Sequence, residues 1–123
     1  MTQPLAIVFY EKLMPGSQLV NRLQDLNYRV QAITDAATLL ATTQREMPML
    51  VLADLASRAD ITRVISDLKA DTATAHIPVI AFADEKATTQ LAAAQTAGAA
   101  LAVSEAALSN YLPQLLNQAL HIE

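Results

Sequence analysis

Pro48-Met49-Leu50-Val51-Leu52-Ala53-Asp54-Leu55 is the stretch of sequence that decides the fold. An apolar run of this length is too short for an ordinary globular helix and is typical of a strand buried on both faces. Such strands belong to parallel sheets covered by helices on both sides, where ligands and chemistry gather at the carboxyl ends of the strands. Asp54 stands at that end of the run, so it is the first candidate for a functional residue.

Composition favours one compact domain. The 123 residues are 53% hydrophobic and 16% charged, so the chain is too apolar to be disordered, and we expect a single domain over residues 1–123. No apolar run approaches the ~20 residues of a membrane span. A net charge of -4 with scattered basic residues argues against direct binding of nucleic acid. The chain has no cysteine and no basic segment before its first apolar run, which fits a cytoplasmic protein.

Nucleotide cofactors are not expected. The chain contains two glycines, Gly16 and Gly98, and they are too far apart for a dinucleotide fingerprint or a phosphate-binding loop. The two histidines, His76 and His121, have no evident catalytic partner in the sequence. We therefore predict no cofactor and no catalytic residue.

Five apolar or alternating runs predict five strands. They cover residues 5–10, 28–33, the run that ends at Asp54, 77–83 and 99–103. Arg29 and Gln31 make the second run more polar than the others, which is typical of an edge strand.

Helical periodicity and capping residues predict five helices, one after each strand. The first is capped by Ser17 after a turn at Met14-Pro15-Gly16 and is closed by Asn27, and the second covers residues 36–45 with Thr34 or Asp35 as its cap. The others start near residue 60, run over 85–97 between Asp84 and Gly98, and start at Ser109 or Asn110 with Pro113 in the first turn. Lys69 is expected on the outward face of the third.

Strand and helix thus alternate five times. The handedness of crossover connections then favours a doubly wound α/β fold: a five-stranded parallel sheet of order 2-1-3-4-5, flavodoxin-like, with five helices.

Three pieces of sequence carry a resemblance to a known family. They are Pro48–Leu55, the Ala-His-Ile-Pro-Val-Ile core of Asp71–Ala83, and Ala97-Gly98-Ala99. With the order of the elements, they resemble the receiver (CheY-like) domain of bacterial response regulators over essentially the whole chain. The resemblance implies a module of two-component signalling or of a phosphorelay.

The resemblance also implies a degenerate site. An active receiver holds Mg²⁺ with an acidic pair after the first strand and with a phosphoacceptor aspartate after the third, and it uses a hydroxyl after the fourth and a lysine after the fifth. At the matching positions this chain has Phe9 and Tyr10 for the acidic pair, Ala83 for the hydroxyl and Glu105 for the lysine; Asp54 remains as the phosphoacceptor equivalent.

These substitutions remove the means of charge neutralisation. Mg²⁺ prefers oxygen ligands anchored by carboxylates, and phosphoryl transfer depends on a cation that stabilises the developing charge. Glu105 places a negative charge where a positive one is needed. We therefore expect an inactive phosphoacceptor, no metal, and a non-enzymatic pseudo-receiver that acts by protein–protein interaction.

A candidate partner surface follows from the helix over 85–97. Its outward positions are almost free of charge, which lowers the cost of burying them against another protein. In the receiver family the fourth helix, fifth strand and fifth helix form the usual partner surface, and we expect a protein partner or a homodimer there. The candidate residues are Thr88, Thr89, Gln90, Gln95, Ala102 and Tyr111. An alanine-rich helix chosen for helical propensity alone is the competing interpretation.

Two further functions stay open at this point. One is an unorthodox phosphoryl-accepting response regulator in which Glu11 or Asp84 helps Asp54 to hold a metal. The other is a sensor that binds a small apolar ligand beside Phe9, Tyr10 and Ala83.

Overall fold

The computed structural model describes residues 4–10, 13–55 and 60–120. Five parallel strands form one sheet with the order β2-β1-β3-β4-β5, as the sequence predicts. The strands are β1 Leu5–Phe9, β2 Arg29–Ile33, β3 Leu50–Asp54, β4 Val79–Ala83 and β5 Leu101–Ser104. The polar strand β2 lies at one edge, which confirms its predicted place.

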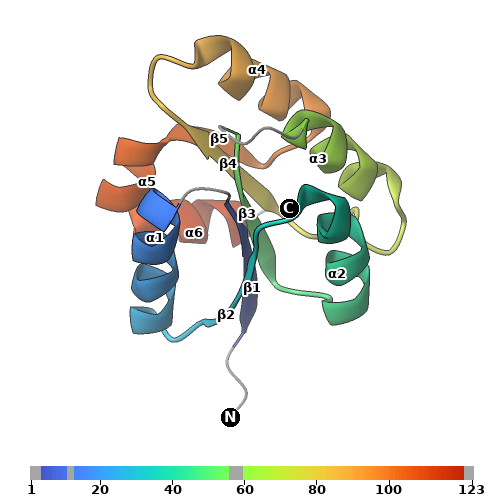
Figure 1. Cartoon of the computed structure of the whole chain (residues 1–123), viewed down its shortest axis with the longest axis horizontal. Helices are drawn as coiled ribbons and strands as arrows, with labels where there is room; N and C mark the ends of the chain where they lie inside the picture. The colour runs from blue at the N-terminus through green and yellow to red at the C-terminus, as the bar shows by residue number, and fades with distance from the viewer. Residues whose placement is uncertain (1–3, 11–12, 56–59, 121–123) are drawn as a thin grey trace.

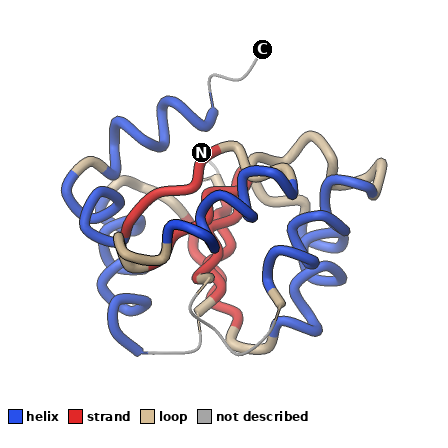
Figure 2. Tube along the Cα trace, turned by 90° about the horizontal axis from the view of Figure 1, so that it is seen from above, coloured by secondary structure: helices blue, strands red, loops and turns tan. Residues whose placement is uncertain are grey.

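Helices cover both faces of this sheet (Figures 1 and 2). The helices are α1 Leu13–Asp25, the 3₁₀ turn η1 Ala36–Thr38, α2 Leu39–Glu46, α3 Ile61–Ala70, α4 Thr88–Ala97, α5 Glu105–Asn110 and α6 Leu112–Leu120. Figure 1 shows α2 and α3 on one side of the sheet and α1, α5 and α6 on the other.

Side chains along each strand alternate between two core clusters. Ile7 and Phe9 of β1 belong to the cluster under α2, α3 and α4, whereas Ala6 and Val8 belong to the cluster under α1, α5 and α6. The central strands are buried along their whole length, because apolar residues occupy both alternating sets. The predicted strand of residues buried on both faces is therefore confirmed for β3.

Three helices begin elsewhere than predicted. The helix predicted over 36–45 is the 3₁₀ turn η1 followed by α2, which begins at Leu39. Helix α1 begins at Leu13, so Met14-Pro15-Gly16 is its first turn and not a separate turn. A proline fits there because the first N–H groups of a helix have no helical acceptor. Helix α4 begins at Thr88 and not at Glu85. Asp84 forms a turn before it, accepting from the N–H of Lys86 at 2.9 Å.

The predicted last helix is two helices. Ser104 caps α5, its hydroxyl oxygen accepting from the N–H of Ala107 at 3.1 Å, and the helix ends at Asn110. Helix α6 starts at Leu112, so a cap at Ser109 or Asn110 is wrong, although Pro113 does lie in the first turn as predicted. The described residues thus form six α-helices instead of five.

Lys69 is not on the outward face. It lies half-buried, and its Nζ donates to the carbonyl oxygens of Ala75 at 3.2 Å and of Ile77 at 2.8 Å. Burial lowers the pKa of this ammonium group. A lysine stem is apolar and packs well beneath a charged end, which an assignment by charge alone overlooks.

Candidate functional site

The predicted site residues come together at the carboxyl edge of the sheet. Phe9 ends β1, Asp54 ends β3 and Ala83 ends β4, and Glu105 follows directly after β5. In the strand register Asp54 lies beside Phe82, and Ala83 lies beside Ser104. These ends form one row across the sheet because all five strands run in the same direction.

Asp54 is almost completely buried. Its side chain is 2% exposed, and Leu55 after it is 4% exposed. The N–H of Leu55 donates to the carbonyl oxygen of Phe82 at 2.9 Å, so the chain stays paired with β4 one residue past the carboxylate. The backbone around Asp54 is therefore fixed by sheet hydrogen bonds, and its side chain is shielded from solvent.

Phe9 and Ala83 are core residues. Both have no exposed surface, and both belong to the cluster under α2, α3 and α4. Tyr10 is half-buried and packs against the other cluster. None of these side chains carries a carboxylate, and Phe9 and Ala83 carry no polar atom at all. The donor set at these three positions therefore does not fit a magnesium ion, which prefers carboxylate and water oxygens.

Glu105 is the first residue of α5 and is half-buried. A carboxylate in the first turn interacts favourably with the helix dipole, which gives this residue a structural reason to be acidic. Together with Asp84, Glu85, Lys86 and Ala106 it lines an open recess of about 330 Å³. This recess lies next to the strand ends but is not lined by Asp54.

Metal ligands do not cluster in the described part of the chain. Within residues 4–10, 13–55 and 60–120, no three aspartate, glutamate, histidine or cysteine side chains are placed to hold a metal ion. Asp84 is exposed and forms the turn before α4. Glu11, the other ligand considered from the sequence, lies outside the described residues.

The predicted partner residues are mostly on the surface. Thr88, Thr89, Gln90 and Gln95 are exposed on α4, and Ala102 is half-buried on β5. Tyr111 is 56% exposed and lies at the junction of α5 and α6. Gln90 also has an internal contact, since its Nε2 donates to the carbonyl oxygen of Leu55 at 3.4 Å. Helix α4 is thereby linked to the residue that follows Asp54.

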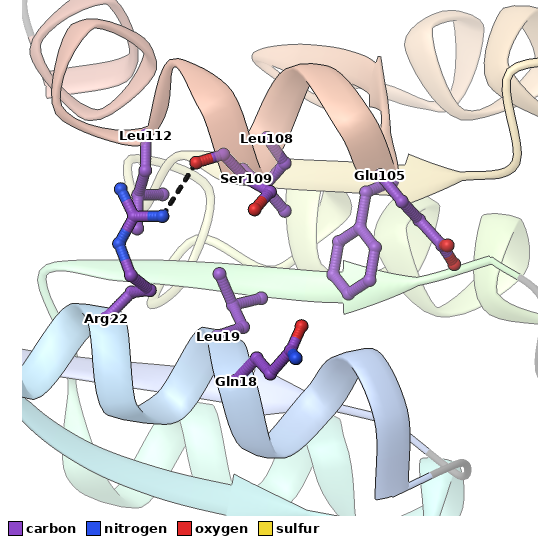
Figure 3. Close-up of a pocket in the computed structure, with 8 residues that line it drawn as sticks. Gln18, Leu19, Arg22, Glu105, Leu108, Ser109 and Leu112 are labelled. Atoms are coloured by element: carbon purple, nitrogen blue, oxygen red, sulfur yellow. Dashed lines mark hydrogen bonds between the residues drawn. The ribbon is translucent and has the colours of Figure 1, made fainter.

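A cleft between α1 and α5 was not predicted from the sequence (Figure 3). Its lining residues are Gln18, Leu19, Arg22, Phe82, Glu105, Leu108, Ser109 and Leu112. Arg22 crosses from α1 and donates from Nη1 to the main-chain carbonyl of Ser109 at 2.8 Å. The available sequence signal is Pro113, which lies four residues after Ser109 and has no N–H for that carbonyl.

In the part of the chain that the structure describes, no helix combines the length and the apolar character needed to cross a bilayer.

Solved structures that superpose on this chain include response regulator receiver domains. The chain superposes on a candidate response regulator from Chloroflexus aurantiacus J-10-fl with a TM-score of 0.90 at 13% identity, over 98% of this chain and 100% of that one. The receiver domain of NtrX from Brucella abortus gives a TM-score of 0.83 at 19% identity, over 96% and 99% of the two chains. Chemotaxis response regulator CheY4 of Vibrio cholerae gives 0.77 at 14% identity, over 93% and 99%.

The sequence itself matches no family model and no curated protein. At these low identities the structural similarity concerns the fold. The predicted receiver (CheY-like) fold is thus confirmed.

Proposed function

We propose that this chain is a pseudo-receiver, a non-enzymatic signalling module that acts by protein–protein interaction without Mg²⁺-dependent phosphorylation of Asp54. The observation that carries the proposal is the burial of Phe9 and Ala83, which are 0% exposed at the ends of β1 and β4. At these two positions a phosphoryl-accepting receiver has a metal-binding carboxylate and a hydroxyl. Here both positions belong to the hydrophobic core.

The charge of Glu105 supports the same conclusion. In a transferring phosphoryl group, negative charge spreads over the oxygens, and a site promotes the reaction by offering cations there. Glu105 offers an anion at the end of β5, and Asp54 is 2% exposed. Both features oppose the approach of a phosphoryl donor to Asp54.

An interaction surface on α4, β5 and α5 is the second part of the proposal. Residues 87–120 contain a single charged residue, Glu105, whereas the chain as a whole has a net charge of -4. Protein interfaces are depleted of charge at their centres, and exposed tyrosine is a frequent anchor there. Tyr111 at the end of α5 is such an exposed aromatic residue. The proposed partner is a protein, either a second copy or another component of a two-component pathway.

The site proposal is tested by incubation with Mg²⁺ and acetyl phosphate, followed by intact mass measurement. We expect no gain of a phosphoryl group, in contrast to a conventional receiver treated in parallel. Phosphorylation that disappears in Asp54→Asn would contradict the proposal and would support the alternative, an unorthodox response regulator with Asp54 as its acceptor. If phosphorylation persists in Asp54→Asn, the phosphoryl group lies on another residue. That result agrees with the proposal that Asp54 is not a phosphoacceptor.

A ligand-sensing role beside Phe9, Tyr10 and Ala83 is not favoured by any specific observation, since Phe9 and Ala83 pack in the core without exposed surface. A cytoplasmic location is part of the proposal and is supported by the absence of cysteine from the sequence.

A further inference from the structure

The cleft between α1 and α5 has an apolar floor. Leu19, Phe82, Leu108 and Leu112 line it, and each of them is at most 6% exposed. The cavity volume is about 40 Å³. A cavity needs about 10–15 Å³ of such volume to hold one water molecule, which is one non-hydrogen atom. The cleft therefore has room for about three non-hydrogen atoms. An isopropyl group has this size.

A fixed cation stands at the rim of the cleft. The bond from Arg22 Nη1 to the carbonyl oxygen of Ser109, at 2.8 Å, holds the guanidinium beside Leu112 (Figure 3). Nη1 is the nitrogen on the cleft side of the guanidinium in Figure 3, and besides the N–H given to Ser109 it carries a second N–H from which a carboxylate can accept. Glu105 lies at the opposite end of the cleft in Figure 3, where it repels a second carboxylate.

We propose that this cleft binds a short, branched aliphatic monocarboxylate. Its isopropyl group contacts Leu19 and Leu108, and its carboxylate pairs with Arg22. This inference goes beyond the proposed function and does not depend on whether Asp54 accepts a phosphoryl group. Charge complementarity at Arg22 selects an acid over its neutral amide, and the apolar floor selects a branched acid over acetate.

Isovalerate is the probe, followed by amide chemical shifts of the intact chain. We expect saturable shifts at Leu19, Arg22 and Leu108 with a dissociation constant in the millimolar range, as for other ligands of this size. Isovaleramide has the same shape without the charge, and acetate has the same charge without the isopropyl group. Both should bind about tenfold more weakly, because each loses one of the two contacts.

Arg22→Gln should remove the preference for isovalerate over isovaleramide, and Arg45→Gln should retain it. Arg45 is the matched control because it lies on α2 and pairs with Glu46 at the surface. If Arg22→Gln does not fold, the proposal is still tested by comparing the binding of isovalerate, isovaleramide and acetate to the unchanged chain.

Four results would overturn the proposal. The first is the absence of saturable shifts at the cleft, and the second is equal binding of isovalerate and isovaleramide. The third is equal binding of acetate and isovalerate, which would mean that Arg22 attracts any carboxylate and that the apolar floor of the cleft contributes nothing. The fourth is tighter binding of N-acetylleucine, which would assign the cleft to the C-terminus of a protein partner.

Discussion

Arg22 of α1 donates from Nη1 to the main-chain carbonyl of Ser109 at 2.8 Å, across a separation of 87 residues in sequence. In a continuous helix this carbonyl would accept from the N–H of residue 113, but that residue is proline. The proline ring also clashes with the carbonyl four residues before it, which breaks a helix. Hence α5 ends at Asn110, α6 begins at Leu112, and Arg22 supplies the missing donor.

Arg22→Gln should lower the free energy of unfolding by about 1 kcal/mol, because it removes a charged donor from a carbonyl that has no helical partner. Urea denaturation measures the change. Arg45→Gln is the control, since Arg45 has a 65% exposed side chain and should change stability by less than about 0.5 kcal/mol. Equal effects of the two variants would contradict the role of Arg22.

Pro113→Ala should reduce the loss of stability that Arg22→Gln causes. Alanine restores the N–H that donates to the carbonyl of Ser109, so the cost of Arg22→Gln should fall by at least about half in this background. A double-mutant cycle of the two substitutions measures the coupling. Strictly additive effects would show that the contribution of Arg22 to stability does not depend on the N–H that Pro113 lacks.

Gly98 has a backbone conformation that a side chain strains. Its φ is +119°, and a Cβ there would lie 2.6 Å from Cγ of Lys69. Gly98→Ala should therefore cost about 1–2 kcal/mol from the backbone alone, with a further loss from the displaced lysine. Thermal or urea unfolding measures the effect.

Lys69→Ala in combination with Gly98→Ala separates the two causes. It removes the 2.6 Å contact with Cγ but leaves a 3.3 Å contact with Cβ of residue 69 and the positive φ, so Gly98→Ala should remain destabilising, by a smaller amount than in the unchanged chain. A neutral Gly98→Ala in either background would contradict the assigned strain.

Acid should destabilise the protein through Asp60 and Asp71. The pKa of Asp60 lies below its usual 3.8 because its carboxylate accepts from the hydroxyl of Thr62 and from the N–H of Arg63. The pKa of Asp71 is lowered in the same direction by Gln44 and by the N–H of Ala73. A folded-state pKa below the unfolded value means that stability is fully present above about pH 5 and is lost as the pH falls through the folded pKa.

The double variant Asp60→Asn, Asp71→Asn should show a smaller loss of stability between about pH 5 and pH 2, because neither asparagine titrates. Asparagine can cap α3 at position 60 as well as aspartate does, and at position 71 its side-chain oxygen can accept from the N–H of Ala73. Urea unfolding at a series of pH values measures this. An unchanged slope in the double variant would refute the assignment.

The strand pattern of this fold is predictable because it depends on local composition. Apolar runs such as Pro48–Leu55 indicate burial on both faces, and Asn27 and Gly98 mark helix ends through their positive φ, at 70° and 119°. The start of α4 and the split of the last helix were not predicted. Asp84 had two local options, a helix cap or a turn, and the sequence alone does not choose between them.

For the candidate site, the sequence predicted which positions meet at the carboxyl edge and that the strands carrying them are buried, but not that the side chain of Asp54 is itself buried. That Asp54 is 2% exposed follows from packing around the ends of β3 and β4, which no motif encodes. The α1–α5 cleft was missed for another reason. It depends on Arg22 and Ser109, which are distant in the sequence and meet only in the folded chain.

The interaction surface predicts weak self-association. Helix α4 carries no charged residue, so the α4 surfaces of two copies can meet without like-charge repulsion. The chain as a whole is acidic, and repulsion between like charges disfavours contact between two copies through other surfaces. Sedimentation equilibrium should detect a dimer that Ala93→Arg on α4 dissociates. Ala41→Arg, at an exposed alanine on α2, should leave the dimer intact. A chain that stays monomeric at high concentration would contradict this prediction.

The most direct test of the account is a nuclear magnetic resonance titration with Mg²⁺ and then beryllofluoride, a mimic of the phosphoryl group. The account predicts that the amide signals of Asp54, Leu55 and Ala83 stay in place, because Phe9 and Ala83 give no side-chain ligand for the metal and Glu105 gives no cation for the phosphoryl group. Saturable shifts at Asp54 that depend on Mg²⁺ and vanish in Asp54→Asn would contradict it.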